Sequence, residues 1–92
     1  MKLIEAVRDL DSFDAGSTVY AAAPWTEDSV VVVAREPESG GLPADAQELG
    51  LNYFLEVFLA RDFLKGWVAH QDEKPTLQQT CSRLIQYAAT DA

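Results

Sequence analysis

The sequence predicts an α+β fold, in which a small three-stranded, mostly antiparallel sheet is combined with an N-terminal helix and two C-terminal helices. Three observations lead to this prediction. Apolar residues recur at helical spacing near both ends of the chain, in residues 2–11 and 76–90. Two short segments between them, 17–23 and 29–35, are expected to be strands, and the second contains four consecutive valines, whose branched side chains favour strands. The apolar segment 51–67 changes halfway from alternation to helical spacing.

Size and composition predict one globular domain over residues 1–92, because the chain has 92 residues of which 48% are hydrophobic. Its single cysteine excludes an intrachain disulfide, which is typical of a reducing compartment. The N-terminal residues 1–13 lack the uninterrupted apolar stretch of a signal peptide. No run approaches the roughly 20 apolar residues of a membrane helix. We therefore expect a soluble, cytoplasmic protein.

The first half of the chain predicts a helix followed by a hairpin. The apolar face of the helix 2–11 consists of Leu3, Ala6, Val7 and Leu10. After a turn at 14–17, strands are expected at 17–23 and 29–35. Pro24 ends the first strand because it has no N–H to donate. The five residues "PWTED" between the strands are a suitable length for a hairpin connection.

The segment 36–50, "EPESGGLPADAQELG", contains two prolines and three glycines, and this composition predicts a mobile loop. A short helix is expected inside it, with Pro43 at the first helical position and Gly50 as the C-terminal cap.

The apolar segment after this loop predicts a strand at 52–59 and a helix at 61–71. Alternation along the strand places Tyr53, Leu55, Val57 and Leu59 on one face and Asn52, Phe54, Glu56 and Phe58 on the other. On the helix, Arg61 and Lys65 belong to an ordinary solvated face. The last helix, 76–90, begins with a T-x-x-Q capping box formed by Thr76 and Gln79.

The predicted sheet has two apolar faces, since Val30 and Val32 alternate with Val31 and Val33. Either the helices divide between the faces, or they cover one face while a second copy or a partner covers the other. Glu56 is a carboxylate within the mainly apolar strand predicted at 52–59. We expect it to be half exposed and paired with a nearby arginine, Arg35 or Arg61, or to serve in an apolar interface.

The charge distribution indicates the class of partner. The net charge is -8, and residues 57–92 hold equal numbers of acids and bases, so the surplus lies in the first two thirds. Such a field repels nucleic-acid backbones and attracts basic proteins. The segment 9–56 contains Arg35 as its one base and ten acids: Asp9, Asp11, Asp14, Glu27, Asp28, Glu36, Glu38, Asp45, Glu48 and Glu56.

No catalytic, cofactor-binding or metal-binding residue is predicted. Cys81 lies on the apolar stripe of the last helix, where cysteine acts as a small hydrophobe. His70 ends a helix, where an imidazolium interacts well with the helix dipole. The sequence "HQDE" at 70–73 is a weak metal motif, and Gly40-Gly41 is not part of a phosphate loop.

The loop 24–29, "PWTEDS", combines an aromatic ring with two carboxylates. Trp25 beside Glu27 and Asp28 suits a cationic side chain of a partner. The alternative is that Trp25 folds back and covers the core.

The pieces "AAAPWTEDS", "LGLNYFLEVFLARDFLKGW" and "KPTLQQTCSRLIQYAATDA" resemble a family of small, acidic bacterial proteins of unknown function. The resemblance covers most of the chain and implies a bacterial, cytoplasmic setting. It implies no activity and assigns no functional residue.

Three hypotheses follow for the function. The favoured one is a non-catalytic interaction module that binds a basic protein, as immunity proteins of similar size and charge do with basic toxins; this is an analogy only. The second is a homodimeric structural protein that associates through a sheet face at Phe54 and Phe58. The third is a small enzyme that uses surface carboxylates. The predicted partner-binding residues are Trp25, Glu27, Asp28, Phe54, Glu56 and Phe58.

Overall fold

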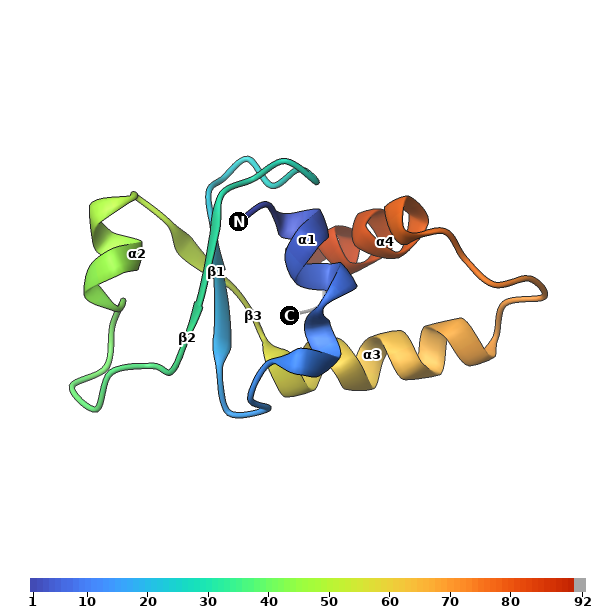
Figure 1. The fold of residues 1–92 in the computed structure, drawn as a ribbon, viewed down its shortest axis with the longest axis horizontal. Helices are drawn as coiled ribbons and strands as arrows, with labels where there is room; N and C mark the ends of the chain where they lie inside the picture. Colours follow the sequence, from blue (N-terminus) through green and yellow to red (C-terminus); the bar gives the residue numbers. More distant parts are fainter. Residues whose placement is uncertain (91–92) are drawn as a thin grey trace.

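The computed structural model describes residues 1–90 and arranges them in three layers (Figure 1). The middle layer is an antiparallel sheet in the order β2-β1-β3. Helices α1, α3 and α4 lie on one side of it and α2 on the other. The predicted α+β class is thus confirmed. The elements are α1 (Leu3–Arg8), β1 (Thr18–Ala21), β2 (Val31–Ala34), α2 (Ala44–Glu48), β3 (Asn52–Glu56), α3 (Val57–Ala69) and α4 (Leu77–Thr90), with a 3-10 turn at Leu10–Ser12.

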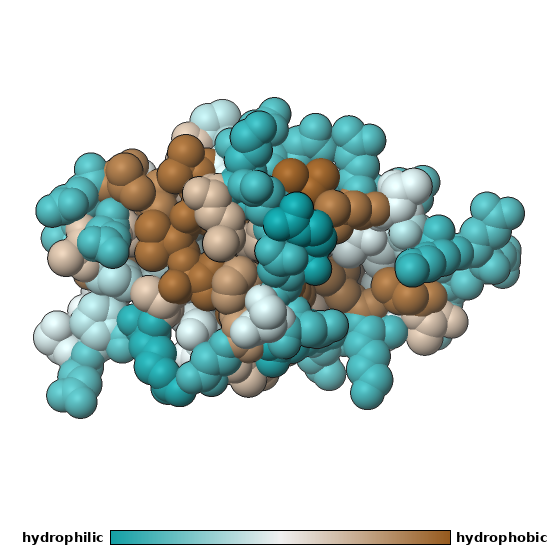
Figure 2. All heavy atoms as spheres, viewed as in Figure 1, coloured by the Kyte–Doolittle hydropathy of each residue, from teal (hydrophilic) through white to brown (hydrophobic). Residues whose placement is uncertain are grey.

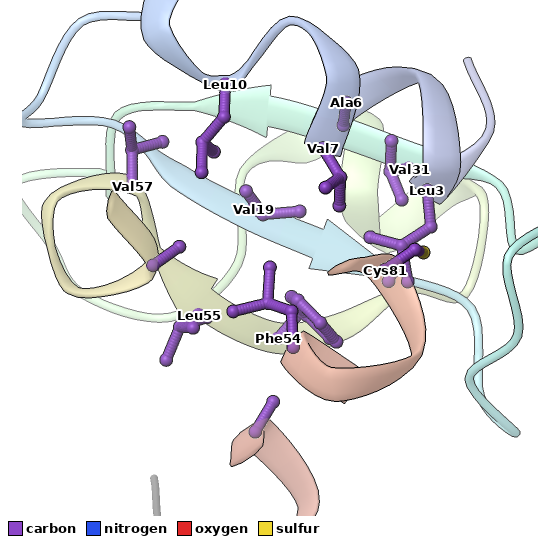
Figure 3. Close-up of a cluster of buried hydrophobic side chains, with 14 of the residues drawn as sticks. Leu3, Ala6, Val7, Leu10, Val19, Val31, Phe54, Leu55, Val57 and Cys81 are labelled. Atoms are coloured by element: carbon purple, nitrogen blue, oxygen red, sulfur yellow. The ribbon is translucent and has the colours of Figure 1, made fainter. Parts of the chain in front are cut away.

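The main core lies between the sheet and the three helices on its right in Figure 1. Figure 3 shows side chains from α1, all three strands and α4 converging there. Leu55 and Cys81 have no solvent exposure. The apolar stripes predicted for the first and last helices therefore point into this core, as expected for amphipathic helices on a sheet.

A second, smaller cluster covers part of the opposite sheet face. It joins Tyr20 of β1 to Ala46 of α2 and to Leu51, with Leu42 and Val32 packed against it. Helices α1, α3 and α4 thus share one face of the sheet, and the segment around α2 covers much of the other.

The predicted short helix in 36–50 is confirmed as α2, but Pro43 is its N-cap rather than its first residue, and Leu49 rather than Gly50 is its C-cap. The mobility of this segment stays a prediction.

Strand β3 contains a bulge that the alternation pattern did not predict. Val19 pairs with Leu55 and Tyr20 pairs with Tyr53, which leaves Phe54 as the extra residue. A bulge places two consecutive side chains on the same side of a strand. Phe54 and Leu55 therefore both enter the main core, and the prediction that they face opposite ways is wrong.

The predicted boundary between strand and helix is also wrong, because α3 begins at Val57 rather than at residue 61. Val57 and Phe58 thus belong to the first turn of a helix. The start of α4 agrees with the prediction. The Thr76 N–H donates to Gln79 Oε1 at 2.9 Å, and the Gln79 N–H donates to Thr76 Oγ1 at 3.1 Å, which completes the capping box.

Arg61 differs from its predicted role on a solvated face. Its guanidinium is partly buried and donates to the Leu10 carbonyl from Nε at 3.1 Å and from Nη2 at 2.9 Å. Nη2 also donates to the Phe13 carbonyl. Arg61 therefore ties α3 to the turn that follows α1. The sequence contained no clue to this, because both acceptors are backbone atoms far away along the chain.

Candidate interaction surface

Trp25, the aromatic residue of the predicted binding loop, folds back onto the core. Its indole N–H donates to the Ala21 carbonyl at 3.3 Å. Its ring meets Phe54 edge-on, with 4.8 Å between centroids and 81° between planes. The indole N–H is thus already bonded, and part of the ring is already in contact with the core. Trp25 therefore contributes to packing as well as to the surface of the loop.

The two carboxylates of this loop are attached to the neighbouring helices. Asp28 forms an ion pair with Lys2, with 3.3 Å between Oδ1 and Nζ. Glu27 accepts a hydrogen bond from Gln78 Nε2 at 3.4 Å, and its carbonyl accepts one from the Ile4 N–H at 3.0 Å. The loop is thus tied to both α1 and α4, and one of its two charges is already compensated.

Phe54 and Phe58 do not form the shared apolar face that the predicted homodimer needs. Phe54 is 1% exposed inside the core, whereas Phe58 is 51% exposed on α3. The bulge and the early start of α3 separate them. A dimer through both rings would require Phe54 to leave the core, so that interface is not present in this structure.

Glu56 lies at the end of β3, opposite Thr18 in the register, and is half-buried. Neither predicted arginine pairs with it within residues 1–90. Arg35 pairs with Asp14 instead, and Arg61 binds backbone carbonyls. Glu56 therefore keeps an uncompensated carboxylate at the edge of the sheet.

Two tyrosines lie close to this carboxylate on the face of the sheet that carries α2. Partial burial raises the pKa of the Tyr53 hydroxyl, and the charges of Glu56 and Glu36 raise it further. Burial likewise raises the pKa of Tyr20, with smaller contributions from the same two carboxylates. Tyr53 is 46% exposed. The structure thus brings Glu36, Tyr53 and Glu56 into one acidic and aromatic patch.

Of this patch, sequence reasoning selected Glu56 and missed Glu36 and Tyr53. The strand alternation assigned Tyr53 to the same face as Leu55, which the bulge reverses. Glu36 was part of a segment read as a loop. Only the pairing of β1 with β3 shows that Tyr53 stands beside Tyr20.

The residues considered for chemistry are separate from one another. Cys81 is buried in the core, and His70 lies exposed just after α3, with its Nδ1 at 2.7 Å from the Gly66 carbonyl oxygen. Within residues 1–90, no group of three or more His, Cys, Asp or Glu side chains is placed to hold a metal ion. The described residues thus show no Cys–His pair of the kind that nucleophilic catalysis uses.

Cys81 is expected to be unreactive in the folded protein. Burial raises the pKa of its thiol to about 11, and the charge of Glu27 adds to the effect. Because the thiolate is the reactive form, a disulfide reagent at pH 7.5 should modify the folded chain at least about 100-fold more slowly than the urea-unfolded chain. Absorbance of the released thiol measures both rates, and equal rates would contradict the buried position.

Comparisons of the chain with protein-family models, with curated proteins and with solved structures find no match. The resemblance to a bacterial family therefore stays a prediction. Within residues 1–90, no helix is both long enough and apolar enough to cross a membrane.

Proposed function

We propose that this chain is a non-catalytic protein-interaction module that binds a basic protein partner in the cytoplasm of a bacterium. The observation that carries the proposal is that the negative charge is distributed unevenly along the molecule. The molecule is elongated, with a longest dimension of 43 Å, so its two ends are well separated. The sequence shows a surplus of acids in 9–56, and the fold gathers part of that surplus at one end.

What we call the acidic end is the segment 36–56, in which α2 lies at one end of the molecule and β3 runs from it through the middle layer to α3. No lysine or arginine occurs between Glu36 and Ala60. Figure 1 shows α2 at the left end of the molecule, far from the connection between α3 and α4 at the right. The acids of this segment that take part in no ion pair within residues 1–90 are Glu36, Glu38, Asp45, Glu48 and Glu56.

Most of the cations elsewhere are compensated inside the chain. The ion pairs are Lys2 with Asp28, Arg8 with Asp9, Arg35 with Asp14, and Arg61 with Asp11. These pairs leave the acidic end as the main uncompensated charge of the described residues. Such a field speeds the encounter with a basic protein and orients it.

The acidic end also exposes apolar groups that can be buried by a partner. Leu49 is 56% exposed at the end of α2, and Tyr53 lies in the patch with Glu36 and Glu56. Aromatic residues within a charged rim are typical of protein interfaces. A lysine or arginine that reaches Tyr53 would meet an aromatic ring and two carboxylates together.

The proposal is tested with two variants of equal net charge. Glu38→Lys with Glu48→Lys reverses two exposed acids at the acidic end, and Asp72→Lys with Glu73→Lys reverses two at the opposite end. Immobilised chains are exposed to bacterial lysate at low salt and eluted at about 1 M salt, where the screening length falls to about 3 Å. Eluted proteins are identified and quantified by mass spectrometry.

We expect the unmodified chain and the opposite-end variant to retain the same basic protein. The acidic-end variant should retain about tenfold less of it, because paired charges across an interface contribute to affinity. Equal retention by the two variants, or the absence of any basic protein from the salt eluate, would contradict the proposed function.

A further inference from the structure

Strand β2 forms one edge of the sheet, and most of its outer side is open. Among the described residues, 1–90, the chain start alone pairs with it there. The Val31 N–H donates to the Met1 carbonyl at 2.9 Å, and the Leu3 N–H donates to the Ser29 carbonyl at 2.8 Å. The bridge between Lys2 and Val30 marks this short ladder. Beyond Val31, no strand within residues 1–90 adjoins the outer edge.

The backbone groups that point outward follow from the ladder. The Ala22 N–H donates to the Val30 carbonyl, so Val30 turns its backbone groups toward β1. The backbone N–H and C=O groups of successive residues point in alternate directions along an antiparallel strand. Those of Val32 and Ala34 therefore also point toward β1. Val33 and the adjoining Arg35 therefore direct their N–H and C=O groups away from the sheet.

Two of the features that usually protect an edge strand, charged side chains and proline, are absent from β2 itself, although β2 is short and Arg35 follows it. No charged residue and no proline occurs in Val30–Ala34, although proteins commonly use both to block unwanted pairing. Val30 is 47% exposed, and Val32 to Ala34 are each partly exposed. Figure 2 shows hydrophobic side chains gathered over the sheet, between α2 and the helices on the other side.

We infer that the outer edge of β2, from Val32 to Arg35, binds an extended basic segment of a partner protein by strand addition. The inference rests on the proposed function for the class of partner and adds the site and the mode of binding. Main-chain hydrogen bonds to Val33 and Arg35 supply the pairing, and alternate apolar side chains of the added strand pack beside Val32.

Charge favours a basic strand over a second copy of this chain. Arg35 is compensated by Asp14, so Glu36 and Glu38 dominate the charge beyond the end of β2. A second copy also has a net charge of -8, and its approach is opposed by that charge. Moreover, Met1 of each copy already pairs at Val31, which shortens the edge that two copies can share.

The test uses a capped peptide of sequence Lys-Val-Thr-Val-Thr-Val-Lys and a control peptide with glutamate at both ends. Amide hydrogen exchange is followed by NMR on the full chain. In the free protein, Val32 should exchange slowly and Val33 rapidly, because only the Val32 amide is bonded to β1. The lysine peptide should slow exchange at Val33 by at least about fivefold.

Two substitutions at one position isolate the main-chain contribution. Val33→Pro removes an N–H that points away from β1, a position where an edge strand tolerates proline. Val33→Thr keeps both the N–H and a similar shape. We expect Val33→Pro to bind the lysine peptide about tenfold more weakly than Val33→Thr. Should Val33→Pro fail to fold, Glu36→Lys with Glu38→Lys provides the second comparison and should weaken binding of the lysine peptide only.

Several results would overturn the inference. The inference fails if the lysine peptide does not bind, or if it binds without slowing amide exchange at Val33. It also fails if Val33→Pro and Val33→Thr bind the lysine peptide equally well, or if the glutamate peptide binds as well as the lysine peptide. A dimer seen by light scattering that Val33→Pro dissociates would assign the edge to a second copy instead. If Val33→Pro still retains the basic protein captured through the acidic end, the inference fails while the proposed function stands.

Discussion

Replacing Phe54 by alanine is expected to lower the free energy of unfolding by about 3–5 kcal/mol, the usual cost of removing a buried aromatic ring. Phe54 is 1% exposed, and its ring is in contact with Trp25. The substitution leaves a cavity next to the bulge and removes the surface on which Trp25 rests. Urea unfolding followed by circular dichroism measures the loss.

Phe58→Ala is the matched control, since it removes the same ring from an exposed position four residues later. We expect a change of no more than about 1 kcal/mol, as for most surface substitutions. Comparable destabilisation by the two variants would show that both rings are buried. That outcome would contradict the bulge in β3 and the start of α3 at Val57.

The second large effect is expected at Arg61. Arg61→Ala should lower the free energy of unfolding by about 1.5–3 kcal/mol, because it removes charge-assisted hydrogen bonds to the carbonyls of Leu10 and Phe13. Arg61→Lys should recover only part of this loss, since an ammonium group does not reproduce the planar fork of a guanidinium. Thermal unfolding at constant pH compares the variants.

Asp62→Ala serves as the control for the same helix. Asp62 is exposed next to Arg61 in the sequence and forms no ion pair within residues 1–90. Its replacement should change the midpoint temperature little. If Arg61→Ala were as mild as Asp62→Ala, Arg61 would belong to a solvated face after all, as its sequence context suggested.

The candidate site could be predicted only in part. The acidic surplus of residues 9–56 and the choice of Glu56 came from composition and position. The burial of Phe54 and the exposure of Tyr53 could not be predicted, because a single extra residue in β3 reverses the alternation on which the assignment depended. The open edge of β2 likewise follows from the strand order, which no local pattern contains.

The sequence by itself determined the class of fold, the number of strands, the amphipathic helices near the two ends of the chain, the N-terminal cap of α4 and the negative net charge. All of these depend on local spacing and composition, which neighbouring residues decide. The tertiary structure alone decided which face of the sheet each helix covers, which carbonyls accept hydrogen bonds from Arg61, and that Glu36, Tyr53 and Glu56 share one patch. Those outcomes depend on contacts between residues far apart in the chain, such as Arg61 and Leu10, whose hydrogen bonds form only after the sheet and helices have packed.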